Sequence, residues 1–266
     1  MKFLPRLSFK YLPLLVFGLL VYVIALIANF PAQRAYAHWQ ASEHASRDIA
    51  LAGISGSVWS GRADVAVIHG QRLQSLQWTL RPWSLLTGQV GLNWRFQVDA
   101  GYGQGSTDLG LDGSVRFAAL EARLPATLLA SLARAGAVRP SGEVSLNLTD
   151  VHWDGHQLRS AEGRIAWHDA GVNIFKPIAL GDLAVNVETK DEAVQGVLSD
   201  GGGPLSAEGL LTLSADGAYQ FSGRFAARGD KDLEQALRTM GRPGADGKVA
   251  VKQSGTLASL GLVPRR

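Results

Sequence analysis

The feature that most constrains this chain is a strict alternation of apolar and polar side chains. It begins within residues 53–88, where Leu76, Trp78 and Leu80 alternate with polar residues. It is clearest in residues 92–99, where every second side chain is large and apolar. Successive side chains of a β-strand point to opposite faces, so a period of two predicts strands with one buried and one solvated face.

Shorter alternations of the same kind continue almost to the end of the chain. Asp154-Gly155 and Asp216-Gly217 lie between such stretches and predict hairpin turns, which make the joined strands antiparallel. The glycine-rich stretch 101–105 is interpreted as a loop. Further strands are predicted within residues 115–123, 144–148, 165–167, 183–187, 211–213, 219–221 and 249–251.

Two stretches change to a helical period. Leucines three and four apart between Pro125 and Gly136 predict one short helix within residues 124–136. Asp230 as N-cap and Gly241 as stop predict a second helix over residues 231–240. We therefore expect a mainly β protein: one large, twisted, mostly antiparallel sheet with a partial-barrel or groove-like curvature, and two short helices.

The N-terminal stretch predicts a membrane anchor. Residues 11–33 contain no formal charge, and a helix of that length reaches about 34 Å against a hydrocarbon core of about 30 Å. Basic residues in 1–10 favour a cytoplasmic N-terminus, followed by a juxtamembrane segment over 34–52 and a β-rich domain over 53–266 on the far side. The alternative is a secretory signal cleaved after Ala37.

Charge and composition exclude several classes of protein. The net charge of +3 equals that of Lys2, Arg6 and Lys10, which are the only charges before residue 34, so the remainder is neutral. A neutral body lacks the basic patch that nucleic-acid binding requires. The chain has no cysteine, which excludes disulfides, thiolate metal sites and cysteine nucleophiles.

No motif in the chain predicts catalysis, a cofactor or a metal. His152 and His156 flank Asp154, but a polar turn tip explains them more simply than a metal site with no third ligand on a rigid element. Gly101-x-Gly103-x-Gly105 lacks the Walker lysine and the following helix of a phosphate loop. We therefore expect a protein that is not an enzyme.

Two blocks in the sequence carry a family resemblance. Residues 56–63 read GSVWSGRA, and residues 73–88 follow the pattern Leu-x-x-Leu-x-Trp-x-Leu-x-Pro-x-x-Leu-Leu-x-Gly. In this order after an apolar N-terminal segment, they resemble the N-terminal signature of the type II secretion system protein N family. The residues that carry the resemblance are Gly56, Trp59, Gly61, Arg62, Leu73, Leu76, Trp78, Leu80, Pro82, Leu85, Leu86 and Gly88.

The resemblance implies a location and a role. Members of that family are accessory components of the bacterial inner membrane in the machine that exports folded proteins across the outer membrane. A single-pass protein with a periplasmic C-terminal domain, whose partners are other secretion components and the inner membrane, is therefore expected. The family is also distantly similar to AsmA-like proteins, which implies a lipid carrier as the alternative function.

The tryptophans allow two interpretations that bear on this choice. Trp78, Trp94 and Trp167 lie on the apolar phases of predicted strands, where core packing is the ordinary role of a large aromatic side chain. The alternative is a ligand groove. A sheet with too few helices to cover it leaves apolar surface open, and open apolar surface usually binds something.

Overall fold

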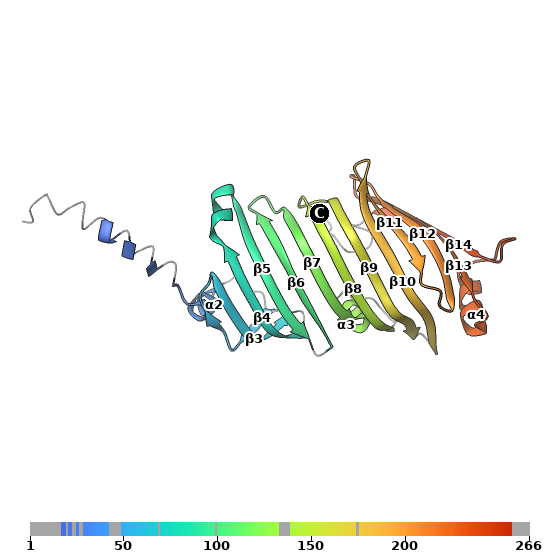
Figure 1. Cartoon of the computed structure of the whole chain (residues 1–266), viewed down its shortest axis with the longest axis horizontal. Coiled ribbons are helices and arrows are strands. Elements are labelled where there is room, and N and C mark those ends of the chain that lie inside the picture. Colours follow the sequence, from blue (N-terminus) through green and yellow to red (C-terminus); the bar gives the residue numbers. More distant parts are fainter. Residues whose placement is uncertain are drawn as a thin grey trace, which may run out of the picture.

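In the computed structural model, one sheet contains all the strands of the described residues (Figure 1). These residues are 17–19, 21–22, 25–26, 29–42, 49–68, 70–98, 100–132, 139–173 and 176–256. The strands are β1 (Ile49–Ala52), β2 (Ser55–Gly56), β3 (Ser60–Ile68), β4 (Gln71–Arg81), β5 (Gln89–Val98), β6 (Gly101–Gly110), β7 (Val115–Pro125), β8 (Arg139–Trp153), β9 (Leu158–Asn173), β10 (Pro177–Lys190), β11 (Ala193–Asp200), β12 (Leu205–Leu213), β13 (Ala218–Ala227) and β14 (Val249–Thr256).

The topology is a meander. From β3 to β14 each strand pairs with its neighbours in sequence, while β1 and β2 both pair with β3. Every pairing is antiparallel. Among the described strands, β1 and β14 are the two ends of an open sheet. The prediction of one large antiparallel sheet is confirmed.

The helices lie at the ends and margins of the sheet rather than over its middle (Figure 1). α2 (Ala32–Gln40) lies beside the first strands, α3 (Ala126–Leu132) follows β7, and α4 (Lys231–Met240) packs beside β13 and β14. The 3-10 helix η2 (Pro82–Thr87) joins β4 to β5. Both predicted short helices are present, and the Asp230 side chain caps α4 by accepting the N–H of Leu233 at 2.9 Å.

One face of the sheet is apolar across ten strands. Directly paired residues share a face, and one such row crosses from β5 to β14 without a polar side chain. The row consists of Phe96, Gly103, Ala122, Leu146, Ile165, Val185, Leu198, Gly209, Gly223 and Val251. We call the side of the sheet that carries this row the apolar face.

The opposite side is polar, and we call it the polar face. Its corresponding row is displaced by one residue on each strand and has two apolar members, Val197 and Leu210, both of which are exposed. The row consists of Arg95, Gln104, Glu121, Asn147, Arg164, Asn186, Val197, Leu210, Ser222 and Lys252. The alternation in the sequence thus corresponds to two chemically distinct faces.

The apolar face has little cover. The described chain has no large side chain that is less than 2% exposed, and alanine is the commonest buried residue. The larger buried cluster forms where Leu233 and Leu237 of α4 pack on Leu205, Ala207 and Val249. Over most of the other strands, the apolar side chains are half-buried by one another.

Strand β1 lies in the juxtamembrane segment 34–52, where no strand was predicted, and two further strands also differ from the prediction. The stretch 101–105, interpreted as a loop, is the first half of β6, so that interpretation is wrong. Strand β11 was not predicted, because Gly196 stands at an apolar-face position and removes the alternation around it. In both strands, a glycine occupies a place where an apolar side chain would have shown the period of two.

The predicted membrane segment, residues 11–33, lies only in part within the described residues. Within it, residues 17–19, 21–22 and 25–26 are helical. No helix in the described part of the chain is both long and apolar enough to cross a membrane. The juxtamembrane segment 34–52 contains most of α2 and all of β1.

An ion pair closes the turn between β11 and β12. Arg228 donates to Asp200 at 2.7 Å, and the backbone N–H groups of Ala207 and Gly202 donate to the same carboxylate at 2.9 Å. The Arg228 hydrogen bond, with those two backbone bonds, lowers the pKa of Asp200 to about 2. Asp200 is therefore ionised at all ordinary pH values.

We predict that Asp200→Asn destabilises the protein in a pH-dependent way. At neutral pH the free energy of unfolding should fall by about 1–2 kcal/mol, since a charge-assisted hydrogen bond becomes a neutral one beside a partly exposed arginine. A carboxyl group with a lowered folded pKa stabilises fully above its unfolded pKa of about 3.9 and progressively less toward about pH 2. Urea unfolding of both proteins should thus show a gap that closes below about pH 4.

Glu234→Gln is the control for this prediction. Glu234 pairs with Arg238 on the exposed surface of α4, so its loss should change stability by less than about 0.5 kcal/mol. A gap between wild type and Asp200→Asn that stays constant down to pH 2 would contradict the role given to the carboxylate.

Candidate functional site

The sheet brings the two signature blocks together. β3 and β4 are neighbours, and Gly61 of the first block pairs with Trp78 of the second. The Trp78 indole N–H donates to the carbonyl of Val58 at 3.0 Å, and the Leu80 N–H donates to the carbonyl of Trp59 at 2.7 Å. The signature is therefore one continuous piece of structure at the N-terminal end of the sheet.

The structure shows a local role or position for most of the other signature residues. Gly56 (φ +88°) and Gly88 (φ +72°) adopt backbone conformations that favour glycine, at the β2 turn and at the end of η2. Arg62 lies on the surface and donates from Nε to the Ser55 hydroxyl at 3.0 Å. Leu73, Leu76 and Leu80 are half-buried in β4, Pro82 begins η2, and Leu85 and Leu86 are exposed.

Aromatic rings lie over glycines on the apolar face. Phe96 and Trp94 of β5 pair with Gly103 and Gly105 of β6. A Cβ added at Gly103 would come within 2.5 Å of the Phe96 ring, and one at Gly105 within 2.8 Å of the Trp94 ring. The two rings are stacked, with centroids 5.7 Å apart, and the Trp94 N–H donates to Thr107 Oγ1 at 2.8 Å. The glycines that looked like a loop thus provide space for the rings.

The same arrangement recurs near the other end of the sheet. Phe221 and Phe225 lie on either side of Gly223 on β13, and a Cβ there would come within 3.0 Å of both rings. Gly209, the partner of Gly223 on β12, also faces the Phe221 ring. Rings packed against backbone therefore cover the apolar face near both of its ends, and α4 adds a second layer at the β12–β14 end.

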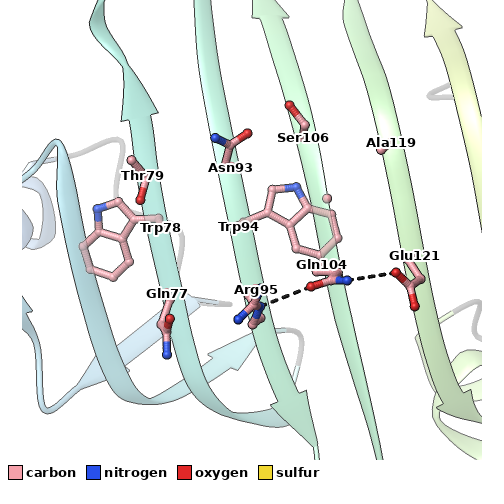
Figure 2. A pocket seen from close by; sticks show the side chains of 11 residues that line it. Gln77, Trp78, Thr79, Asn93, Trp94, Arg95, Gln104, Ser106, Ala119 and Glu121 are labelled. Carbon is pink, nitrogen blue, oxygen red and sulfur yellow. Dashed lines mark hydrogen bonds between the residues drawn. The ribbon is translucent and has the colours of Figure 1, made fainter.

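A depression of about 420 Å³ lies across β4 to β7, and both polar side chains and the tryptophans Trp78 and Trp94 line it (Figure 2). Short side chains on paired positions line its middle, and a row of longer ones forms its lower border in this view. In that border Arg95 donates to Gln104 at 3.2 Å, and Gln104 donates to Glu121 at 2.8 Å. The short side chains are Thr79, Asn93, Ser106 and Ala119.

Hydrogen bonds shift the pKa of Glu121, which lines this depression, and that of its partner Tyr102. Hydrogen bonds from Gln104 and then Tyr102 lower the pKa of Glu121, and the bond to Glu121 raises the pKa of Tyr102. The Glu121 carboxylate is therefore ionised and the Tyr102 phenol neutral around pH 7.

In the described chain, hydrogen bonding lowers the pKa of five carboxyl groups: Asp112, Glu121, Asp154, Asp200 and Glu208.

The histidine pair considered as a metal site belongs to a hairpin turn. Asp154 accepts the backbone N–H groups of His156 and Gln157, each at 2.9 Å, and pairs with Arg159. These bonds, the backbone ones first, lower the pKa of Asp154 well below its ordinary value. Within the described ranges, no group of three or more histidine, aspartate or glutamate side chains could hold a metal ion.

The fold and its faces define a class of protein: a one-layer antiparallel β-meander with an apolar and a polar face. Within this class, the chain belongs to the type II secretion system protein N family, whose model matches residues 47–252. The family resemblance read from the two signature blocks is thereby confirmed. The matched residues include almost the whole sheet, from before β1 into β14.

Individual relatives support this assignment over most of the chain. Type II secretion system protein N of Vibrio cholerae is 26% identical over 254 residues, which cover 91% of this chain and 98% of the relative. The protein of the same name from Aeromonas hydrophila is 22% identical over 90% of this chain and 96% of its own. That from Klebsiella pneumoniae is 31% identical over 69% and 73%. No solved structure matches the chain.

We predict that Gly103→Val destabilises the sheet by displacing the Phe96 ring. The expected loss is about 1–3 kcal/mol in the free energy of unfolding, the usual range for overpacking. Ser106→Ala changes the opposite face of the same strand and should cost less than about 0.5 kcal/mol. Urea unfolding followed by tryptophan fluorescence measures both.

A double substitution separates the ring from other effects of the valine. In the Phe96→Ala background, Gly103→Val should cost clearly less, because the ring that it displaces is gone. An equal cost in both backgrounds would show that the glycine is needed for something other than the ring.

Proposed function

We propose that the protein is a non-catalytic accessory component of the type II secretion system that acts through contacts with other components of that system. The observation that carries this proposal is the family match over residues 47–252, which spans nearly all of the two-faced sheet. The polar row and the apolar row each extend over ten strands, so each face of the sheet offers a long surface for contact with a partner protein.

The proposal includes a place in the cell. Residues 11–33 span the inner membrane once, with the N-terminus in the cytoplasm and residues 53–266 in the periplasm. The uncharged length of the segment and the basic residues before it support this orientation.

We predict that alkaline phosphatase fused after Arg266 is active in cells, since that enzyme requires an oxidising compartment for its disulfides. A reporter that works only in the cytoplasm, fused at the same junction, should be inactive. The reverse pair of results would overturn the proposed orientation.

A second function, lipid carriage, is favoured by one specific observation. Among the helices of the described chain, α4 packs on β12 to β14 at one end of the apolar row, and α3 contacts β7 and β8 at the margin of the sheet. The aliphatic side chains that the middle strands carry in this row are half-buried. Contiguous apolar surface exposed at this scale is unusual for a protein that meets only water. The acyl chains of a lipid are one partner that would cover it.

We predict that a photo-crosslinking side chain distinguishes the two faces in cells. Leu146 and Asn147 are adjacent on β8 and point to opposite faces, because Leu146 pairs with Ala122 and Ile165 while Asn147 pairs with Glu121 and Arg164. If lipid lies on the apolar face, benzoylphenylalanine at position 146 should form phospholipid adducts, and the same residue at position 147 should not. Mass spectrometry of the purified full chain measures both.

The partner recovered decides between the two functions. Adducts of position 146 with secretion-system proteins, without lipid, would assign the apolar face to protein contact. Phospholipid adducts at both positions in equal amount would show non-specific labelling and contradict lipid binding by one face.

A further inference from the structure

Five large apolar side chains are exposed in and beside the β4–β5 and β6–β7 connections, toward the N-terminal end of the sheet. Trp83 and Leu86 in η2 are each 80% exposed, and Leu111 in the β6–β7 turn is 85% exposed. Leu85 and Leu109 beside them are 48% and 39% exposed. We call Trp83, Leu85, Leu86, Leu109 and Leu111 the apolar knob. A side chain that is four-fifths exposed protrudes from its surroundings, so the knob is convex rather than grooved.

The two parts of the knob are held side by side. The Leu111 N–H donates to the carbonyl of Gly88, the residue that ends η2, at 3.3 Å. Gln89 and Gly110, which flank the two turns, are paired residues of β5 and β6. The knob is therefore one surface built from two connections.

The exposure of the knob is fixed by local structure. The Ser84 hydroxyl donates to the carbonyl of Arg81 at 2.6 Å and accepts the N–H of Gly91 at 2.7 Å, which ties η2 to both flanking strands. The Arg81 guanidinium pairs with Asp108 on β6, and Gly91 lies between them, where a Cβ would collide with both Arg81 and Ser84. These contacts thus fix the position of η2, in which Trp83 and Leu86 are exposed.

The knob lies near the point where the N-terminal apolar segment meets the sheet. The carbonyl of Phe30 accepts the N–H of Val58 at 3.0 Å, and the next residue, Trp59, accepts the N–H of Leu80. Two residues after Leu80, Pro82 begins η2. The end of segment 11–33 and the knob are thus joined by a short series of backbone contacts at one end of β4.

The chemistry of the knob favours a lipid surface over a protein partner. A stable protein interface buries about 800 Å² on each side with matched shape, whereas a bilayer accepts a small convex apolar protrusion without matching it. Tryptophan and leucine are typical of membrane–water interfaces. Of the charged groups nearby, Arg81 pairs with Asp108, and the Asp112 carboxylate accepts the Ser114 N–H at 2.9 Å.

We propose that the apolar knob inserts into the interfacial layer of the membrane beside the N-terminal segment and holds this end of the sheet on the bilayer. The identity of this membrane as the inner membrane rests on the location given under the proposed function. The chain then has two membrane contacts, a tether and a knob, and the sheet cannot turn freely about the tether.

The natural absence of cysteine allows a direct test with the full chain. Leu86→Cys and Leu111→Cys are each labelled with the environment-sensitive fluorophore NBD and reconstituted in phosphatidylethanolamine–phosphatidylglycerol vesicles, with or without phosphatidylcholine brominated on its acyl chains. The control is Met240→Cys, an exposed apolar position in α4 at the opposite end of the sheet (Figure 1). Thermal unfolding of each variant should match that of wild type, because these side chains are mostly exposed.

Bromolipid should quench the fluorophore at positions 86 and 111 about twofold or more, as expected at interfacial depth, and leave position 240 almost unchanged. Equal, weak quenching at all three positions in a chain that stays in the vesicles would overturn the knob while leaving the tether intact. A chain that does not remain in the vesicles at all would overturn both the knob and the proposed membrane anchor. If the proposed role in secretion is wrong but the knob does insert into the membrane, quenching at positions 86 and 111 should still be observed.

Discussion

The backbone hydrogen bonds between consecutive strands are the interaction on which the rest of the structure depends. A folded domain usually has two layers that bury a core between them, but the described sheet has helices only at its ends and margins. Burial of large side chains therefore supplies less of the stability than in a two-layer domain. The continuous antiparallel ladder, reinforced by rings packed on Gly103, Gly105 and Gly223, keeps the strands in register.

This dependence explains which parts of the fold the sequence predicted. The alternation of side chains follows from the strand itself, so strands such as β4 and β5 were predicted whether or not a second layer exists. The hairpins at Asp154-Gly155 and Asp216-Gly217 and the helix α4 were also predicted, because their turn and cap residues act locally. Strands β6 and β11 were missed, since a glycine that makes room for a neighbouring strand's side chain looks the same in sequence as a glycine in a turn.

The candidate site was predictable only in part. The two signature blocks identified the family and the strands that carry them, and Gly61 under Trp78 explains why the blocks occur together. The exposure of Leu85 and Leu86 could not be predicted, because a pair of leucines in the sequence looks the same whether it is buried or exposed. These two are exposed because η2 lies at the ends of the strands. The side-chain hydrogen bonds from Arg95 through Gln104 to Glu121 join residues on three different strands, so no local sequence pattern indicates them.

The meander order of the strands makes the size of the protein adjustable. From β4 onward each strand forms its backbone hydrogen bonds only with its neighbours in sequence, so adding or removing one hairpin leaves the route of the remaining chain unchanged. Each hairpin contributes two strands, or about 9–10 Å of sheet width, and it extends the apolar and polar rows together. Gain or loss of hairpins would thus change the reach of both faces in equal steps, while the first strands and the surface at their end stay as they are.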